Sequence, residues 1–219
     1  MSTEVPSTEG ALRLGCLISG GGRTVLNLAE ALERDSIPAD IRVVIAHREA
    51  VAGVRRCREA GLPVTIVPLG GSDESPDAVS DRVDQALEKA GVDMVCLAGY
   101  LRHFRVGSRW QDRVINIHPS LLPRHGGPGM YGSRVHAAVI EAGDAVSGCT
   151  VHAVDEIYDH GAVIHQRECP VLPGDDIDSL AARVFAEECL AFPEVISAIS
   201  RGEVSIDRGR VRGSVTSRC

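Results

Sequence analysis

Three consecutive stretches of the chain pair a short apolar run with a segment whose apolar residues recur at helical spacing. The apolar runs cover residues 12–19, 41–46 and 64–67, and the helical patterns that follow cover 25–32, 50–60 and 75–89. Strands that alternate with helices pair in parallel through right-handed crossovers. The sequence therefore predicts an α/β fold built on a doubly wound, mostly parallel sheet.

The rest of the chain refines this prediction. Residues 94–98 have almost no polar side chain, as expected of a central strand covered on both faces. A last helix should begin at Asp178, and Pro193 should kink or divide it. Further segments complete the expected order: a strand over 114–117, a glycine-rich loop over 124–133, a helix over 135–142, and a C-terminal β-hairpin over 148–154 and 163–171.

The ends of the chain differ in composition from its middle. Residues 1–11 are polar and acidic, and we expect a disordered tail there. Residues 12–204 are predicted to form a single domain, because a chain of 219 residues can bury one sizeable core. Residues 205–219 are polar and basic, and a frayed tail is the favoured interpretation.

The composition argues against several classes of function. Lys and Arg number 23 against 30 Asp and Glu, for a net charge of −7, so no broad basic surface is expected to hold nucleic acid. No apolar run reaches the length of a membrane span. The seven cysteines are scattered and odd in number, as is typical of buried thiols in a reducing compartment, so a cytoplasmic location is expected. Neither Cys-x-x-Cys nor His-Glu-x-x-His occurs, and no metal is expected.

The first predicted strand ends in a glycine turn, Gly20-Gly21-Gly22-Arg23-Thr24. Such a turn places free backbone N–H groups at a helix N-terminus, where a phosphate can bind. No Gly-Lys-Ser/Thr follows, and Val25 occupies the third glycine position of a dinucleotide fingerprint, so neither of those nucleotide motifs fits. The alternative is that the glycines only permit a sharp turn.

The segment Asn116-Ile117-His118-Pro119-Ser120-Leu121-Leu122-Pro123 follows an apolar strand. Residues two apart on a strand project to the same face, so Asn116 and His118 should enter one site together. An imidazole can take a proton from an attacking amine, and a carboxamide can donate to a developing oxyanion. A lone histidine is more often structural, however. Loop carboxylates such as those over 155–159 are more often solvated than catalytic.

Taken together, these residues resemble the phosphoribosylglycinamide formyltransferase family from about Leu12 to Val204. The match rests on four motifs: Leu17-Ile18-Ser19-Gly20-x-Gly22, Leu97-Ala98-Gly99-Tyr100-Leu101-Arg102, Asn116 to Pro123, and Cys149-Thr150-Val151-His152 with Asp159 seven residues later. The third motif is specific to folate-dependent formyl transfer as a class. The family has a Rossmann-like sheet that ends in an antiparallel hairpin and a helix.

The resemblance implies a function and a site. 10-Formyltetrahydrofolate would be the co-substrate, and its formyl group would pass to the amine of phosphoribosyl-glycinamide without a metal. Asn116, His118 and Asp159 would form the catalytic triad, and Glu188 would contact the amine end of the substrate. The substrate phosphate would lie on Gly20, Gly21, Gly22, Arg23 and Thr24, and the folate on Leu97, Leu101, Arg102, His103, Phe104, Asp155, Glu156, Ile157 and Tyr158.

Two segments depart from the family pattern. The family usually has Gly-Ser-Asn where this chain has Gly22-Arg23-Thr24, so Arg23 brings a cation to the expected phosphate site. It would strengthen phosphate binding or accompany a different acceptor. The loop over 124–133 is longer than in the commonest members and resembles a variant of some bacterial ones.

Other functions remain as alternatives. Methionyl-tRNA formyltransferase and formyltetrahydrofolate hydrolase share the same three residues, but both normally carry an extra domain for which 219 residues leave no room. Another folate-dependent formyltransferase, acting on a different phosphorylated or sugar amine, is a further alternative. A non-catalytic folate- or nucleotide-binding module is the alternative from a different class. The oligomeric state is open, and a homodimer is one option.

Overall fold

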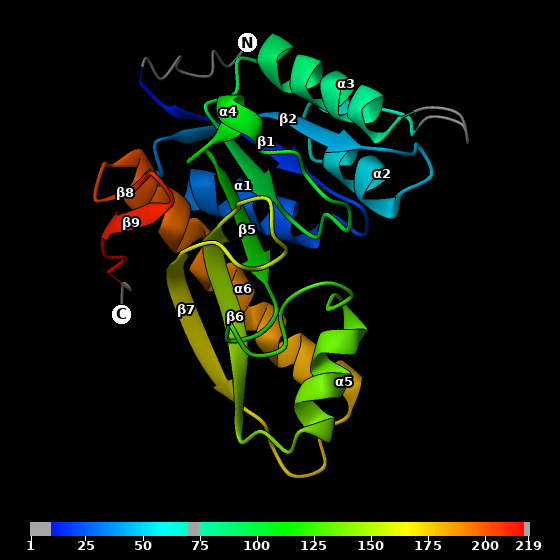
Figure 1. Ribbon diagram of the computed structural model, residues 1–219, viewed down its shortest axis with the longest axis vertical. Coiled ribbons are helices and arrows are strands. Elements are labelled where there is room, and N and C mark those ends of the chain that lie inside the picture. The colour runs from blue at the N-terminus through cyan, green and yellow to red at the C-terminus, as the bar shows by residue number, and fades with distance from the viewer. Residues whose placement is uncertain (1–9, 70–74, 217–219) are drawn as a thin grey trace.

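The computed structural model describes residues 10–69 and 75–216, and it contains a seven-stranded sheet in the order β3-β2-β1-β4-β5-β6-β7 (Figure 1). The first five strands are parallel, and the last two are antiparallel to their neighbours. The strands are β1 (Leu12–Leu17), β2 (Ala39–Ala46), β3 (Val64–Ile66), β4 (Met94–Leu97), β5 (Val114–His118), β6 (Val146–Ala153) and β7 (Val163–Pro170). The predicted doubly wound sheet with a C-terminal hairpin is confirmed. Most of the tail expected over residues 1–11 lies outside the described residues.

Helices cover both faces of this sheet. One apolar cluster joins the sheet to α1, α2, α5 and α6, and a second cluster joins the opposite face to α3 and α4. The helices are α1 (Arg23–Arg34), α2 (Ala52–Glu59), α3 (Pro76–Lys89), α4 (Gly107–Trp110), α5 (Ser133–Glu141) and α6 (Ile177–Ser200). The short α4 was not expected from the sequence, because its four residues are too few to show a helical period.

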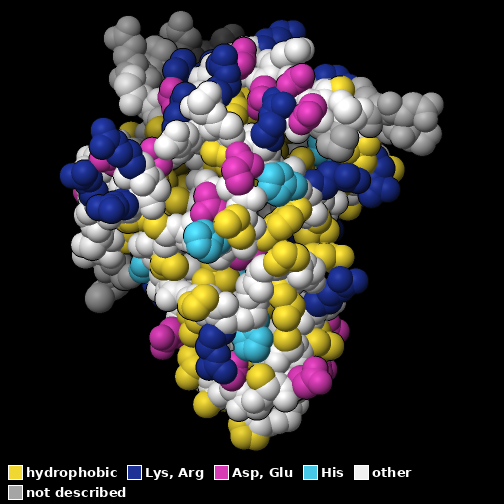
Figure 2. Space-filling model, viewed as in Figure 1, with side chains coloured by type: hydrophobic (Ala, Val, Ile, Leu, Met, Phe, Trp, Pro, Cys, Tyr) yellow, Lys and Arg dark blue, Asp and Glu magenta, His cyan; other side chains and the backbone are white. Residues whose placement is uncertain are grey.

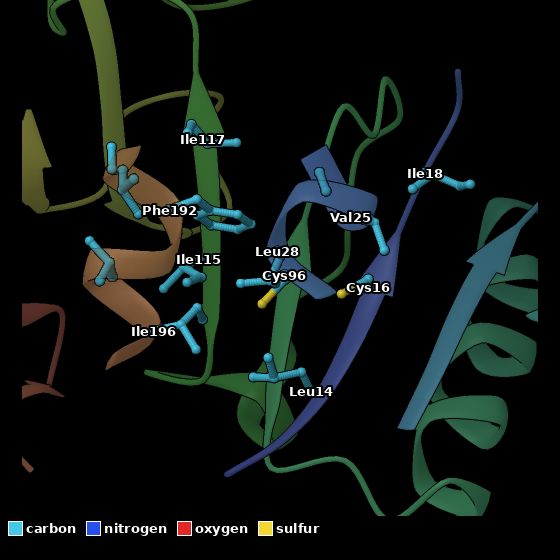
Figure 3. Packing of buried hydrophobic residues seen from close by; sticks show 14 of the residues in the cluster. Leu14, Cys16, Ile18, Val25, Leu28, Cys96, Ile115, Ile117, Phe192 and Ile196 are labelled. Carbon is cyan, nitrogen blue, oxygen red and sulfur yellow. The ribbon is translucent and has the colours of Figure 1, made fainter. Parts of the chain in front are cut away.

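The middle of the sheet is the most deeply buried part of the molecule. β4 is the fourth of the seven strands, as its apolar sequence predicted, and all four of its residues are buried. On neighbouring β1, Cys16 packs into the cluster under α1 and the adjacent Leu17 packs into the cluster under α3. Figure 3 shows Phe192 and Ile196 of α6 lying against Ile115 of β5 in the first cluster. Because helices pack on both faces of the sheet, the ends of β1, β4 and β5 are fixed relative to one another.

Helix α6 runs through Pro193 without being divided. It spans 24 residues and begins at Ile177, one residue before the predicted start. Asp176 caps it through a capping box with Ser179. A proline has no N–H, so the carbonyl four residues earlier, that of Cys189, has no helical donor. Asn27 of α1 supplies one, because its Nδ2 donates to the Cys189 carbonyl at 2.8 Å. The proline is therefore accommodated by a side chain that is distant in the sequence.

The C-terminal segment is ordered, and the prediction of a frayed tail over residues 205–219 is wrong as far as residue 213. β8 (Val204–Asp207) and β9 (Arg210–Gly213) form an antiparallel hairpin. Its turn residues Arg208 and Gly209 both have positive φ, and their N–H groups donate to the Asp112 carboxylate at 2.8 and 2.7 Å. Val204 is buried, and Ile206 packs against the main core. Val204 and Ile206 are two residues apart, as in a strand with one buried face. The four arginines from residue 201 to residue 212 made this apolar pattern hard to recognise in the sequence.

Candidate active site

A cleft of about 610 Å³ opens where β1, β4 and β5 end. Except for Glu156, the residues predicted for the site all line this cleft, from the glycine turn at one end to the 155–159 loop at the other. The Glu156 side chain turns away, and its Oε1 accepts a hydrogen bond from the Gly107 N–H at 3.0 Å. Figure 2 shows histidine, acidic and apolar side chains side by side in the middle of the face between α4 and α5. Segments far apart in the sequence thus form one site.

The glycine turn forms the first end of the cleft. Gly22 is the N-cap of α1 with φ 69°, and no side chain caps this helix. A Cβ at Gly22 would lie 3.0 Å from the Cα of Gly53, so a larger residue would not fit in this turn. The uncapped N–H groups at the start of α1 are suited to bind an anion.

Arg23, the first residue of α1, lies at this same end of the cleft. Its guanidinium is exposed and stacks over the ring of Phe185, with Cζ 4.0 Å from the ring centroid. Such stacking restricts a flexible side chain and leaves its N–H donors directed outward. The cation that departs from the family pattern is therefore oriented beside the glycine turn.

Asn116 and His118 share one face of β5, as the two-residue spacing predicted, and both line the cleft. Asn116 lies directly opposite His152 of antiparallel β6, and its Nδ2 donates to His152 Nε2 at 3.1 Å. The other ring nitrogen of His152 donates to the Ala153 carbonyl at 2.7 Å. This second bond leaves Nε2 as the acceptor, so His152 orients the Asn116 amide with one N–H left over.

Asp159 reaches the same point from the loop after β6. Its carboxylate Oδ2 lies 3.5 Å from His118 Nδ1 and accepts the Gly127 N–H at 2.9 Å, while Oδ1 lies 3.6 Å from His152 Nε2. Asp159 has φ 55°, a backbone conformation that aspartate tolerates better than most residues. The side chains of His118 and Asp159 are only 4% and 10% exposed. Asn116, His118 and Asp159 therefore converge on one largely dry spot.

Burial and mutual contacts set the charges of this group. Burial lowers the pKa of His118 below its usual value, although the neighbouring Asp159 carboxylate and the His125 carbonyl act in the opposite direction. Burial by itself would raise the pKa of Asp159. The neighbouring His152 and His118 rings and the N–H of Gly127 together outweigh burial and lower that pKa. At neutral pH the site therefore pairs an ionised Asp159 with a neutral His118 that has one nitrogen free to take a proton.

Glu188 lies on α6, three residues after Phe185, and lines the cleft near Arg23. Burial raises the pKa of its carboxyl group to about 7, and the nearby Arg23 cation only partly offsets this effect. A carboxyl group with a pKa near neutrality can accept a proton from, or pair with, a bound amine.

The expected folate-binding segments form the second end of the cleft. Leu101, Ile157 and Tyr158 line it with exposed apolar surface, an unusual feature unless a ligand covers it. His103 holds the two segments together: its Nε2 donates to the Glu156 carbonyl at 3.1 Å, and its ring meets the edge of Tyr158 at 5.4 Å.

Sequence reasoning missed several side chains of this site. His152 ends the family motif Cys149-Thr150-Val151-His152, but nothing local in the sequence indicates that it lies opposite Asn116. Phe185 is one helical turn before Glu188, a spacing that can be seen once α6 is known. His136 of α5 also lines the cleft, and its buried Nδ1 has no hydrogen-bond partner among the described residues.

Two negative findings concern the described residues. Over residues 10–69 and 75–216, no three His, Cys, Asp or Glu side chains are grouped so that they could hold a metal ion. Over the same ranges, none of the helices combines the length and the apolar character needed to cross a bilayer.

Comparison with known proteins places this chain in a family. The model of the formyl transferase family matches residues 12–196. A chloroplastic phosphoribosylglycinamide formyltransferase of Vigna unguiculata is 40% identical over 189 residues, which are 85% of this chain and 60% of that protein. The trifunctional purine biosynthetic protein adenosine-3 of Drosophila melanogaster is 40% identical over 200 residues, 89% of this chain and 14% of that protein. The chain thus spans less than two thirds of these relatives.

A solved structure agrees along nearly the whole chain. The crystal structure of glycinamide ribonucleotide transformylase 1 from Symbiobacterium toebii superimposes with a TM-score of 0.86 at 34% identity, covering 97% of this chain and all of that one. The family match and the fold both agree with the resemblance seen in the sequence. This chain belongs to the formyl transferase family.

Proposed function

We propose that this chain transfers the formyl group of 10-formyltetrahydrofolate to the amine of 5-phosphoribosyl-glycinamide, a step of de novo purine synthesis. The observation that carries the proposal is the convergence of Asn116, His118 and Asp159 midway along a cleft with chemically different ends. The names of the Vigna and Symbiobacterium proteins support the same activity.

Each end of the cleft suits one substrate. The N–H groups at the start of α1, together with Arg23, would bind the phosphate of the acceptor. Glu188 would hold the amine end, and the exposed apolar side chains of the other end would cover the folate. The formyl carbon and the amine would then meet beside Asn116. Holding two reactants in this way removes much of the entropic barrier to their reaction.

The reaction begins when the amine nitrogen attacks the formyl carbon and the carbonyl oxygen becomes an oxyanion. The free N–H of the Asn116 amide is placed to donate to this oxygen, because His152 already holds the other. A fixed donor in a water-poor site costs little reorganisation when the charge develops. Asn116 thus acts on the transition state rather than on the substrate.

His118 and Asp159 handle the proton. His118 donates from Nε2 to the His125 carbonyl, so its Nδ1, which faces Asp159, is the nitrogen able to accept the proton of the attacking amine. The imidazolium that results lies next to the ionised Asp159, which stabilises it, and its positive charge stabilises the nearby oxyanion. The proton then passes to the departing folate nitrogen as the C–N bond breaks.

The test measures the spectrophotometric release of tetrahydrofolate from 10-formyltetrahydrofolate, with and without added phosphoribosyl-glycinamide. We expect release only with the acceptor. Release without acceptor would indicate hydrolysis, and binding of folate without any release would indicate a binding module. A series of phosphoribosyl amines compared in the same assay tests whether Arg23 accompanies a different acceptor.

Several broader expectations belong to this proposal. They are a cytoplasmic location, small-molecule substrates without nucleic acid, and activity without a metal; the oligomeric state is open, with a homodimer as one option. The scattered cysteines support the location, since five of them are buried free thiols, whereas the Vigna relative is named chloroplastic. Activity after treatment with a chelator tests whether a metal is needed, and sedimentation tests the oligomeric state.

A further inference from the structure

The backbone of residues 124–127 touches both ionisable members of the proposed triad. The His125 carbonyl accepts the hydrogen bond from His118 Nε2 at 2.9 Å. Two residues later, the Gly127 N–H donates to Asp159 Oδ2 at 2.9 Å. One short loop therefore sets the ring orientation of His118 and the place of the Asp159 carboxylate.

This loop is held from behind by one carboxylate. Asp144, which lies between α5 and β6, accepts a hydrogen bond from His125 Nε2 at 2.7 Å on one oxygen, and Arg124 pairs with its other oxygen. The side chains of Asp144 and His125 are 8% and 15% exposed, whereas that of Arg124 is 65% exposed. The sheltered half of this contact is the pair of His125 and Asp144.

The backbone at His125 needs such a restraint. His125 has φ 53°, a left-handed backbone conformation that is strained for a residue with a side chain and persists only where the surroundings hold it. The His125 ring points to Asp144 while its carbonyl points to His118. If the ring lost its partner, the peptide would be free to relax, and the acceptor of His118 would move with it.

We infer that Asp144 and His125 are positioning residues for formyl transfer, which hold the 124–127 loop so that His118 and Asp159 keep their catalytic orientation. The inference rests on the proposed function. Neither residue lines the catalytic cleft, so both act through the loop backbone. Catalytic side chains keep their activity only if they stay well within about 1 Å of their productive position. A side chain misplaced by about 1 Å costs about 100-fold in rate.

The experiment compares two substitutions at one position. His125→Asn keeps a residue type that tolerates positive φ, but its side chain ends before the position of Nε2 and loses Asp144. His125→Gln carries an N–H donor at a similar reach. We expect His125→Asn to lower kcat by about 10- to 100-fold with little change in the KM of the phosphorylated acceptor. His125→Gln should recover most of that loss.

Two controls separate positioning from a general loss of structure. Arg124→Ala removes the exposed partner of the same carboxylate and should change kcat by less than about twofold. In a His118→Ala background, His125→Asn should cost almost nothing, because Asp159 acts as one unit with His118 and its orientation no longer matters once His118 is gone. An undiminished kcat in His125→Asn, or an equal loss in both backgrounds, would overturn the inference.

A spectroscopic measurement tests the inference without relying on activity. In ¹⁵N-histidine spectra, we expect the wild-type His118 ring to carry its proton on Nε2, and His125→Asn to disturb that signal while His125→Gln restores it. An unchanged His118 signal in folded His125→Asn would count against the inference even if the acceptor assay failed. A failed assay beside the expected signals would instead reject the proposed function alone.

Discussion

The two working regions of the cleft are built in opposite ways. At the end proposed to bind phosphate, the donors are backbone N–H groups and an exposed arginine stacked on Phe185. At the catalytic centre, His118 and His152 are 3% and 2% exposed, and the pKa values of His118 and Asp159 are both lowered. The end with Arg23 is open to water, and its donors keep the same charge throughout. The centre with His118 and Asp159 is closed, and its groups are ones that gain or lose protons.

The difference teaches what each region is able to do. Water screens an exposed cation, and its attraction to a phosphate is the same before and during the reaction. A buried group feels every change of charge strongly, so it acts when charge develops in the transition state. We therefore expect substitutions at the open end to change binding, and substitutions at the closed centre to change turnover.

The largest expected effect tests the closed centre. Asn116→Ala, His118→Ala and Asp159→Asn should each fold normally and lower kcat, by about 10²–10³ for loss of the oxyanion donor and about 10²–10⁴ for loss of the proton-transfer groups. Steady-state kinetics with both substrates measure these losses. A His118→Ala variant that kept more than about a tenth of wild-type turnover would contradict the assignment.

The double variant sharpens this expectation. Because His118 and Asp159 act as one unit, changing both should cost far less than the product of the two single losses. Independent, multiplicative losses would mean that the two residues serve separate steps.

The next effect tests the open end. Arg23→Ala should raise the KM of the phosphorylated acceptor by a factor equivalent to about 1.5–3 kcal/mol, with a smaller effect on kcat. Arg34→Ala, an exposed cation at the far end of the same helix, is the matched control and should leave the KM unchanged. If KM did not respond in Arg23→Ala, the arginine would be only a surface residue stacked on Phe185.

A smaller effect concerns Glu188, which lines the cleft near Arg23. Folding raises its pKa from 4.5 to about 7, so the folded state favours the protonated form. Its contribution to stability is complete below about pH 4.5 and is lost as the pH rises through 7. Glu188→Gln mimics the protonated group and should raise Tm by roughly 2–8 °C at pH 8.5, with a much smaller change at pH 5.

The exposed Glu168→Gln is the control for this measurement, with no difference expected between the two pH values. A Glu188→Gln variant whose Tm gain did not depend on pH would show that its carboxyl group ionises normally.

The smallest effect lies outside the cleft and leaves both regions intact. Asp112→Asn keeps the size and the tolerance for positive φ at that position, but the amide offers one acceptor in place of two to the turn of the C-terminal hairpin. We expect a loss of about 0.5–1.5 kcal/mol in unfolding free energy, with kcat and KM unchanged. Chemical denaturation measures the loss, and altered kinetics would show that the hairpin influences the cleft.

Much of the fold could be predicted because its signals are local. A strand repeats every two residues and a helix every 3.6, so the order of elements and the shared face of Asn116 and His118 are visible in the sequence. The family motifs identified Asp159 and Glu188 as site residues, and the structure brings both to the cleft. The hairpin of residues 204–213 was not predicted, because its arginines made the segment look like a polar tail.

Other features depend on contacts between distant residues, and only the tertiary structure decided them. His152 orients Asn116 because the register of β5 and β6 puts them opposite each other. Asn27 satisfies the carbonyl left bare by Pro193 from a different helix. The carbonyl that holds His118 and the N–H that holds Asp159 are backbone groups, which every residue possesses, so no side-chain pattern marks them. The sequence by itself determined which reactive groups are present, and long-range packing decided what each of them faces.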